Sequence, residues 1–137
     1  MHKNILRKQG GFTLLELLIV IVIIGILAVL IVPNLISGPQ RARDSQRKSD
    51  LRNIKTALET YYNDNNTYPD SSGWEADLEA NGAYIKDVPE DPKSKAAYAY
   101  TPSCTGAVCD SYTISATLEN SRDPEATNGT YTVSSAN

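Results

Sequence analysis

The stretch FTLLELLIVIVIIGILAVLIVPNLI, residues 12–36, decides the architecture of this chain of 137 residues. Twenty of its 25 residues are apolar, and it holds 18 of the chain's 30 Leu, Ile and Val residues. A helix that crosses a membrane needs about 20 mostly apolar residues, so this stretch is long enough to be one. The overall apolar content of 41% resembles that of a globular protein only because it averages two different regions.

The rest of the chain is poor in aliphatic side chains. From residue 56 to the C-terminus it has only eight Leu, Ile and Val residues. A domain of that size with so few branched aliphatics has a thin hydrophobic core. The composition therefore excludes a compact soluble enzyme and indicates a membrane helix that carries a small, polar, tyrosine-rich head.

The charges are divided as unevenly as the apolar residues. Residues 41–55, called the basic segment below, hold six basic and two acidic residues, whereas residues 56–137 hold four basic and 13 acidic ones. The net charge of −3 thus combines a basic region next to the membrane helix with an acidic head.

The motif GGFTLLE, residues 10–16, follows a short basic leader and places Glu16 inside the apolar run. A charge in a membrane helix costs about 2.5–3.5 kcal/mol at the helix centre and less near an end, so Glu16 is a functional candidate. The alternative interpretation is that the Glu16 carboxylate merely lies at the depth of the lipid headgroups. A secretory signal would carry a small-residue cleavage site after the apolar run, but this run ends in Val32-Pro33-Asn34.

Residues 11–17, GFTLLEL, resemble the prepilin signal of type IV pilins and type II secretion pseudopilins. The resemblance implies that a prepilin peptidase cuts between Gly11 and Phe12 and N-methylates Phe12. Glu16 matches the family's glutamate, which is expected to pair with the terminal ammonium of Phe12 on a neighbouring subunit and so to set the register of assembly. In a low dielectric such a pair offsets much of the cost of desolvation.

The family resemblance implies a structural subunit rather than an enzyme. We expect a type IV pilin that polymerises through its N-terminal helix into an extracytoplasmic filament, or fimbrium, for adhesion, motility or DNA uptake; the alternative is a major pseudopilin acting in protein export. A single-pass binding module or an anchored enzyme fits less well, because the chain without its leader has no His and no phosphate loop.

The same resemblance implies the partners and the location. The partners are further copies in a helical filament, the prepilin peptidase and methyltransferase, an inner-membrane assembly platform, minor pilins and membrane lipid. We expect a single-pass inner-membrane protein with a cytoplasmic leader and an external head. After assembly, the filament lies at the cell surface or in the envelope.

The expected fold is α+β, the pilin fold, in which a long kinked N-terminal helix packs on a small antiparallel sheet. The leader covers residues 1–11, the transmembrane and assembly helix 12–36, its amphipathic continuation 37–62, the connecting loop 63–95, and the sheet with a disulfide loop 96–137. Leu51, Ile54, Leu58 and Tyr61 recur at helical spacing. Residues 74–80 predict a short helix, and period-2 alternation predicts strands at 96–101, 111–118 and 129–134.

Two residues of the apolar run weaken a helix. Gly25 does so through backbone entropy, and Pro33 through its missing N–H group. In the family, a matching proline ends a stretch that loosens when the subunit enters the filament. We therefore predict helix loosening at Gly25 and Pro33, with a second bend at Pro39.

The basic segment has three interpretations. Its side chains form a solvated face, or they meet acidic heads of other subunits or anionic lipid, or they bind DNA by neutralising phosphates. No aromatic residue lies between the basic residues to stack on bases, so the first two interpretations together are preferred.

Cys104 and Cys109 enclose four residues between two expected strands. A zinc site lacks further Cys or His ligands outside the leader, and the spacing differs from the C-x-x-C redox motif. We predict a disulfide that closes a hairpin loop and stabilises the head by roughly 2 kcal/mol. Many type IV pilins carry a disulfide loop near the C-terminus, usually a longer one.

A metal is the remaining cofactor to consider. In major pseudopilins a loop near residues 119–128 holds calcium, which makes Glu119 and Asp123 the candidate ligands here. The stretch lacks a dense Asp-x-Asp-Gly run, so the preferred expectation is a solvated loop and no cofactor.

Overall fold

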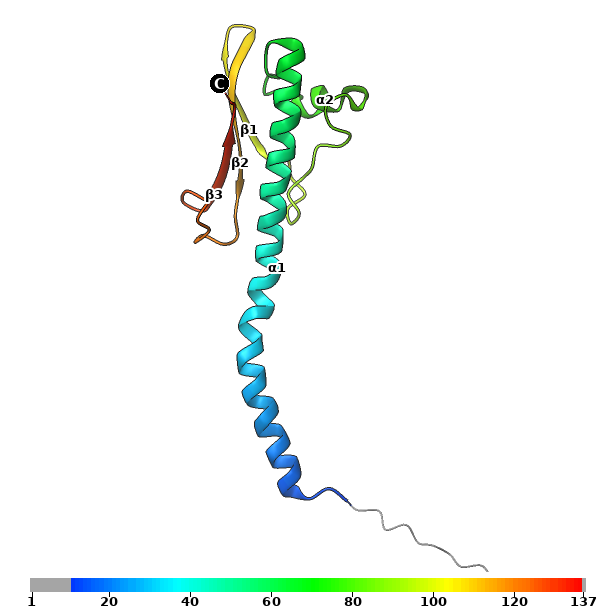
Figure 1. The fold of residues 1–137 in the computed structure, drawn as a ribbon, viewed down its shortest axis with the longest axis vertical. Coiled ribbons are helices and arrows are strands. Elements are labelled where there is room, and N and C mark those ends of the chain that lie inside the picture. The colour runs from blue at the N-terminus through cyan, green and yellow to red at the C-terminus, as the bar shows by residue number, and fades with distance from the viewer. Residues whose placement is uncertain (1–10, 137) are drawn as a thin grey trace, which may run out of the picture. The chain divides into compact units, whose positions relative to one another are not determined.

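The computed structural model describes residues 11–136, apart from the side chains of residues 32–36, and confirms the α+β architecture (Figure 1). Its elements are α1 (Leu14–Asn65), α2 (Trp74–Glu79), the 3₁₀ helix η1 (Ala80–Gly82), β1 (Ala99–Thr105), β2 (Val108–Thr117) and β3 (Thr130–Ser134). The chain divides into two compact units, Met1–Ser37 and Gly38–Asn137, and the second is called the head below.

The long helix α1 runs through 52 residues, including Gly25, Pro33 and Pro39. It ends three residues later than the sequence predicts, because the expected terminator starting at Asn63 is still helical. Asn66, which follows the helix, has a φ of 56° and donates its N–H to the carbonyl of Tyr62. Asparagine tolerates this left-handed conformation, so it supplies the stop.

A three-stranded antiparallel sheet in the order β1-β2-β3 forms the second layer of the head. The central strand β2 alternates as predicted, burying Tyr112, Ile114 and Ala116 on one face. The first strand begins three residues later than the prediction and extends to Thr105, because its hairpin with β2 is tight.

The core of the head lies between the sheet and the second half of α1 (Figure 1). Leu51, Ile54 and Leu58 are fully buried, as their helical spacing predicts. Aromatic residues provide much of the remaining volume: the ring centres of Tyr68 and Tyr112 lie 4.7 Å apart. Large aromatic side chains bury more apolar area each than aliphatic ones, so they make up for the few aliphatics.

A carboxylate satisfies the hydroxyl groups of the two most buried tyrosines. Tyr68 and Tyr112 donate to the two oxygens of Glu59 on α1 at 2.9 and 3.0 Å. A buried hydroxyl without a partner is destabilising. Glu59 therefore allows these tyrosines to be used as core residues and connects α1 with β2.

Candidate processing and assembly site

The peptide bond between Gly11 and Phe12 lies in irregular backbone just before α1 begins at Leu14. Gly11 and Phe12 are both exposed, and a side chain added at Gly11 would meet no heavy atom within 4 Å. A peptidase needs access to the bond that it cuts, and both residues of the predicted cleavage position are exposed and lie outside regular secondary structure. The basic leader that precedes it lies outside the described residues.

The predicted register residue Glu16 closes a capping box with Thr13 at the start of α1. The backbone N–H and the hydroxyl of Thr13 both donate to Glu16 Oε2 at 2.9 Å, and the N–H of Glu16 donates to Thr13 Oγ1 at 3.2 Å. The spacing Thr-x-x-Glu in the sequence is a signal for this motif, which the prediction for Glu16 did not include. Thr13, which directly follows Phe12, thus positions the Glu16 carboxylate within its own chain.

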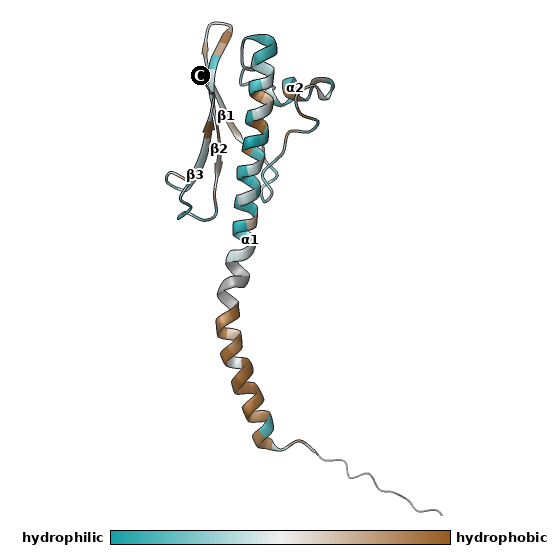
Figure 2. Ribbon diagram, in the orientation of Figure 1, coloured by the Kyte–Doolittle hydropathy of each residue, from teal (hydrophilic) through white to brown (hydrophobic). Residues whose placement is uncertain are grey.

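The N-terminal half of α1 is strongly apolar (Figure 2), and its large apolar side chains are exposed from Leu14 to Ile31. Leu14–Ile31 has a mean hydropathy of 3.3 and is the one span among the described residues that could cross a membrane by its length and composition. Every Leu, Ile and Val in it is at least 48% exposed. Such a surface needs lipid or other apolar helices around it.

The predicted helix-loosening residues lie inside this continuous helix. Gly25 faces open space, and Pro33 belongs to α1, although its side chain lies outside the described residues. Loosening at these two positions stays a prediction.

Two cations of the basic segment, Arg43 and Lys48, pair with acidic residues of the head, whereas Arg41 and Arg52 of the same segment are exposed. Arg43 donates to both oxygens of Glu119 at 2.6 and 2.8 Å, and Lys48 Nζ lies 2.6 Å from Asp123 Oδ1. The interpretation as a free basic surface for lipid, acidic heads or DNA is therefore wrong for these two cations. Their partners lie 76 and 75 positions away in the sequence, so no local pattern announces them.

Arg47 is the most buried cation of the segment. Its guanidinium contacts Asp44 at 2.7 Å, Asp91 at 2.5 Å and Glu119 at 3.2 Å, and its side chain is 4% exposed. The hydrogen bond from Arg47 keeps the pKa of Asp91 well below its usual range. Hydrogen bonds from Arg43 and then Arg47 lower the pKa of Glu119 to about 2.

The two candidate calcium ligands are thus occupied by cationic side chains. Glu119 pairs with arginines and Lys93, while Asp123 pairs with Lys48. Within residues 11–136, no group of three or more His, Cys, Asp or Glu side chains is arranged to hold a metal ion. The donor set therefore does not fit calcium at Glu119 and Asp123.

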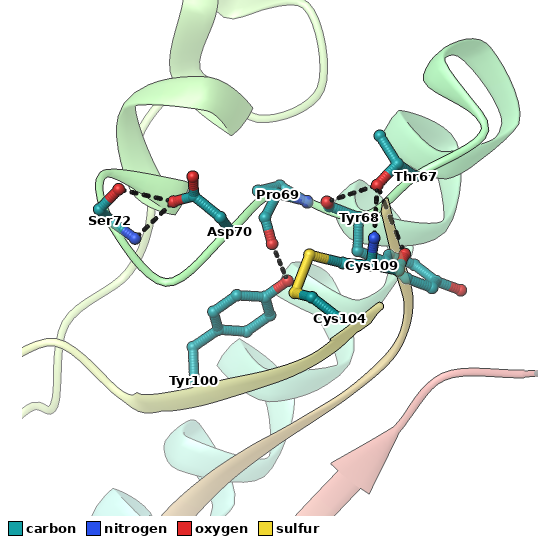
Figure 3. Close-up of a disulfide and its surroundings, with 8 residues drawn as sticks. All are labelled: Thr67, Tyr68, Pro69, Asp70, Ser72, Tyr100, Cys104 and Cys109. Atoms are coloured by element: carbon teal, nitrogen blue, oxygen red, sulfur yellow. Dashed lines mark hydrogen bonds between the residues drawn. A yellow bond between two sulfur atoms is a disulfide. The ribbon is translucent and has the colours of Figure 1, made fainter. Parts of the chain in front are cut away.

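The predicted disulfide between Cys104 and Cys109 is confirmed, and it closes the hairpin between β1 and β2 (Figure 3). Cys109 also anchors this hairpin to the segment after α1. Its carbonyl accepts the N–H of Tyr68, and its N–H donates to Thr67 Oγ1, both at 2.9 Å. Tyr100 adds a third contact by donating its hydroxyl to the carbonyl of Pro69 at 2.8 Å. The disulfide is thus a structural part of the head.

Two known families match successive parts of the chain. Residues 6–32 match the prokaryotic N-terminal methylation motif, and residues 34–126 match protein G of the type II secretion system (T2SS). The first match includes the candidate cleavage position and Glu16, and the second covers most of the head.

Curated relatives are similar to this chain over most of their length. The type II secretion system core protein G of Vibrio cholerae is 36% identical over 122 residues, which is 81% of this chain and 83% of that protein. The protein of the same name from Pseudomonas aeruginosa is also 36% identical over 122 residues, which is 80% of this chain and 85% of that protein. The Aeromonas hydrophila protein of this name is 42% identical over 101 residues, which is 63% of this chain and 68% of that protein.

Proposed function

Because the chain belongs to the type II secretion system protein G family, we propose that it is a pseudopilin that polymerises through α1 into an envelope filament acting in protein export. The observation that carries this proposal is the exposed apolar helix Leu14–Ile31, which directly follows a processing motif and continues into the head. The expectation of a type IV pilus is replaced, since the family match favours the secretion alternative. The proposed role is structural rather than catalytic.

Processing creates the group that assembly requires. A cut between Gly11 and Phe12 leaves an ammonium at Phe12, and N-methylation of that amine keeps its positive charge. In a bundle of apolar helices this ammonium has few polar partners, and the Glu16 carboxylate of an adjacent copy is the strongest one available. The pair then fixes how far one subunit is shifted along the next.

The proposed location follows from the same helix. Before assembly, Leu14–Ile31 anchors the subunit in the inner membrane with the head outside. The partners there are the prepilin peptidase, an assembly platform and minor subunits. During assembly the apolar surface exchanges lipid for the helices of other copies, so it remains covered throughout.

Mass spectrometry of the protein from its native membrane tests the processing step. We expect a chain that starts at Phe12 and carries one N-methyl group. Gly11→Val should leave the uncut precursor, because a branched side chain at the cleavage position obstructs the peptidase. Gly38→Val is the matched control, since Gly38 also faces open space and lies far along α1. A mature N-terminus at any other residue overturns the proposal.

A surface pilus is the second candidate, and the hairpin disulfide favours it because many pilins carry a disulfide loop near the C-terminus, although usually a longer one. Electron microscopy of native cells with a labelled antibody against the head separates the two. Filaments confined to the envelope support the pseudopilin, whereas long surface fibres support the pilus.

A further inference from the structure

The loop between β2 and β3, residues 118–129, is held against α1 by ion pairs along most of its length. Glu119 binds Arg43 through two parallel hydrogen bonds, at 2.6 and 2.8 Å. Further along, Asp123 and Glu125 lie 2.6 and 3.6 Å from the same Lys48 ammonium. Three carboxylates of one loop thus face the cations of one helix.

The backbone of the loop is anchored as well. Asp44 accepts the N–H of Glu119 at 2.9 Å and the N–H of Asn120 at 2.8 Å. Asp44 is itself 3% exposed and paired with Arg47. The loop therefore begins on a buried, fully hydrogen-bonded anchor.

The charges of this network balance without any added ion. Its ion pairs join five cations to five carboxylates: Arg43, Arg47, Lys48, Arg52 and Lys93 with Asp44, Asp91, Glu119, Asp123 and Glu125. A calcium ion needs six to eight oxygen ligands at about 2.3–2.6 Å. In this loop the Lys48 ammonium already lies between the two carboxylates nearest to it, so a divalent ion would add charge that nothing compensates.

We infer that the arginine and lysine side chains of α1 replace a divalent cation as the ligand of the 118–129 loop, so that the head folds without bound metal. This chain carries the counter-charge of the loop in its own helix, at Arg43 and Lys48. The inference concerns the stability of the head alone, so it can fail while the proposed function stands.

Thermal unfolding of the purified full chain in detergent tests the inference, with the fluorescence of the buried Trp74 as the signal. We expect the same midpoint in excess EDTA and in millimolar calcium. The inference is overturned if EDTA lowers the midpoint or calcium raises it. This comparison needs no variant, so it is decisive even if a substitution prevents folding.

Two variants test whether the helix cations hold the loop. Arg43→Gln and Lys48→Gln should each lower the midpoint by about 4–8 °C. Arg41→Gln is the matched control, because Arg41 is exposed and lies outside the ion pairs of the described residues. Equal midpoints for Lys48→Gln and Arg41→Gln would contradict the inference.

Discussion

Arg47 and Asp44 form a buried ion pair one turn apart on α1, with Arg47 Nη1 2.7 Å from Asp44 Oδ1. Each residue of the pair also holds a different loop of the head. Asp44 accepts backbone N–H groups from residues 119 and 120, while Arg47 donates to Asp91 in the loop that precedes β1. One turn of helix thus organises two connections that lie far apart in the sequence.

Replacing Arg47 by methionine should therefore destabilise the head strongly. The substitution keeps most of the side-chain volume but leaves Asp44 and Asp91 without their main counter-charge. Removing one partner of a buried ion pair costs about 3–5 kcal/mol, and we expect a loss in that range in urea unfolding. Arg41→Met, at an exposed position of the same helix, should change the free energy of unfolding by less than about 0.5 kcal/mol. Similar losses in both variants would show that the pair is unimportant.

Replacing aspartate by asparagine should have different effects at two buried positions of α1, Asp44 and Asp50. Asp44→Asn removes the charge that faces Arg47 and directs an amide at backbone N–H groups, so it should cost about 1–3 kcal/mol. Asp50 is 8% exposed and accepts the hydroxyl of Tyr98 at 2.8 Å, and its pKa is raised chiefly by burial. Asn at position 50 keeps the acceptor and removes the buried charge.

Asp50→Asn should therefore leave stability at pH 7 equal or higher, by up to about 1 kcal/mol. Urea unfolding of the two variants beside the parent chain measures both effects. A loss at position 50 as large as that at position 44 would contradict this assignment.

The lowered carboxylate pKa values predict how acid weakens the head. The pKa of Glu119 is about 2, and that of Asp91 is also lowered, because arginine hydrogen bonds stabilise their ionised forms. In the unfolded chain such groups titrate near pH 4, so their contribution is complete above about pH 5 and is lost as the pH falls from 4 towards 2. Urea midpoints should fall across this window. Glu119→Gln should show a flatter dependence there, and a curve parallel to that of the parent would refute the assignment.

Reduction of the hairpin disulfide should lower the free energy of unfolding by about 2 kcal/mol, since the loop that Cys104 and Cys109 close is short. Urea unfolding of the same preparation with and without a reductant measures this difference. The double variant Cys104→Ser/Cys109→Ser is the control, because its stability should not respond to the reductant. If oxidised and reduced protein are equally stable, the anchoring of Cys109 by Thr67 and Tyr68 holds the hairpin by itself.

Local sequence patterns predicted those features that depend on near neighbours. The spacing of Leu51, Ile54 and Leu58 identified the buried face of α1, and all three are 0% exposed. Cys104 and Cys109 could be paired because only four residues separate them. Both results follow from periodicity or proximity along the chain.

The role of the basic segment could not be predicted in this way. Arg47 and Asp91 are 44 positions apart, and a charged residue on a helix has the same local pattern whether it faces solvent or a distant loop. The end of α1 was similarly ambiguous, because several consecutive Asn and Asp residues can each stop a helix. Only the left-handed backbone at Asn66 decides among them.

The last prediction concerns Glu16, whose carboxylate Thr13 holds at the start of the exposed helix. Glu16→Ala should leave membrane insertion and processing intact, because it makes the segment more apolar and does not alter Gly11 or Phe12. It should reduce filament assembly by about a hundredfold or more, since losing one partner of a buried pair costs about 3–5 kcal/mol. Carbonate extraction measures insertion, and sedimentation of sheared filaments measures assembly. Leu18→Ala, which truncates one apolar side chain of the same helix, should still assemble. Normal filaments from Glu16→Ala would show that the carboxylate does not set the register between subunits.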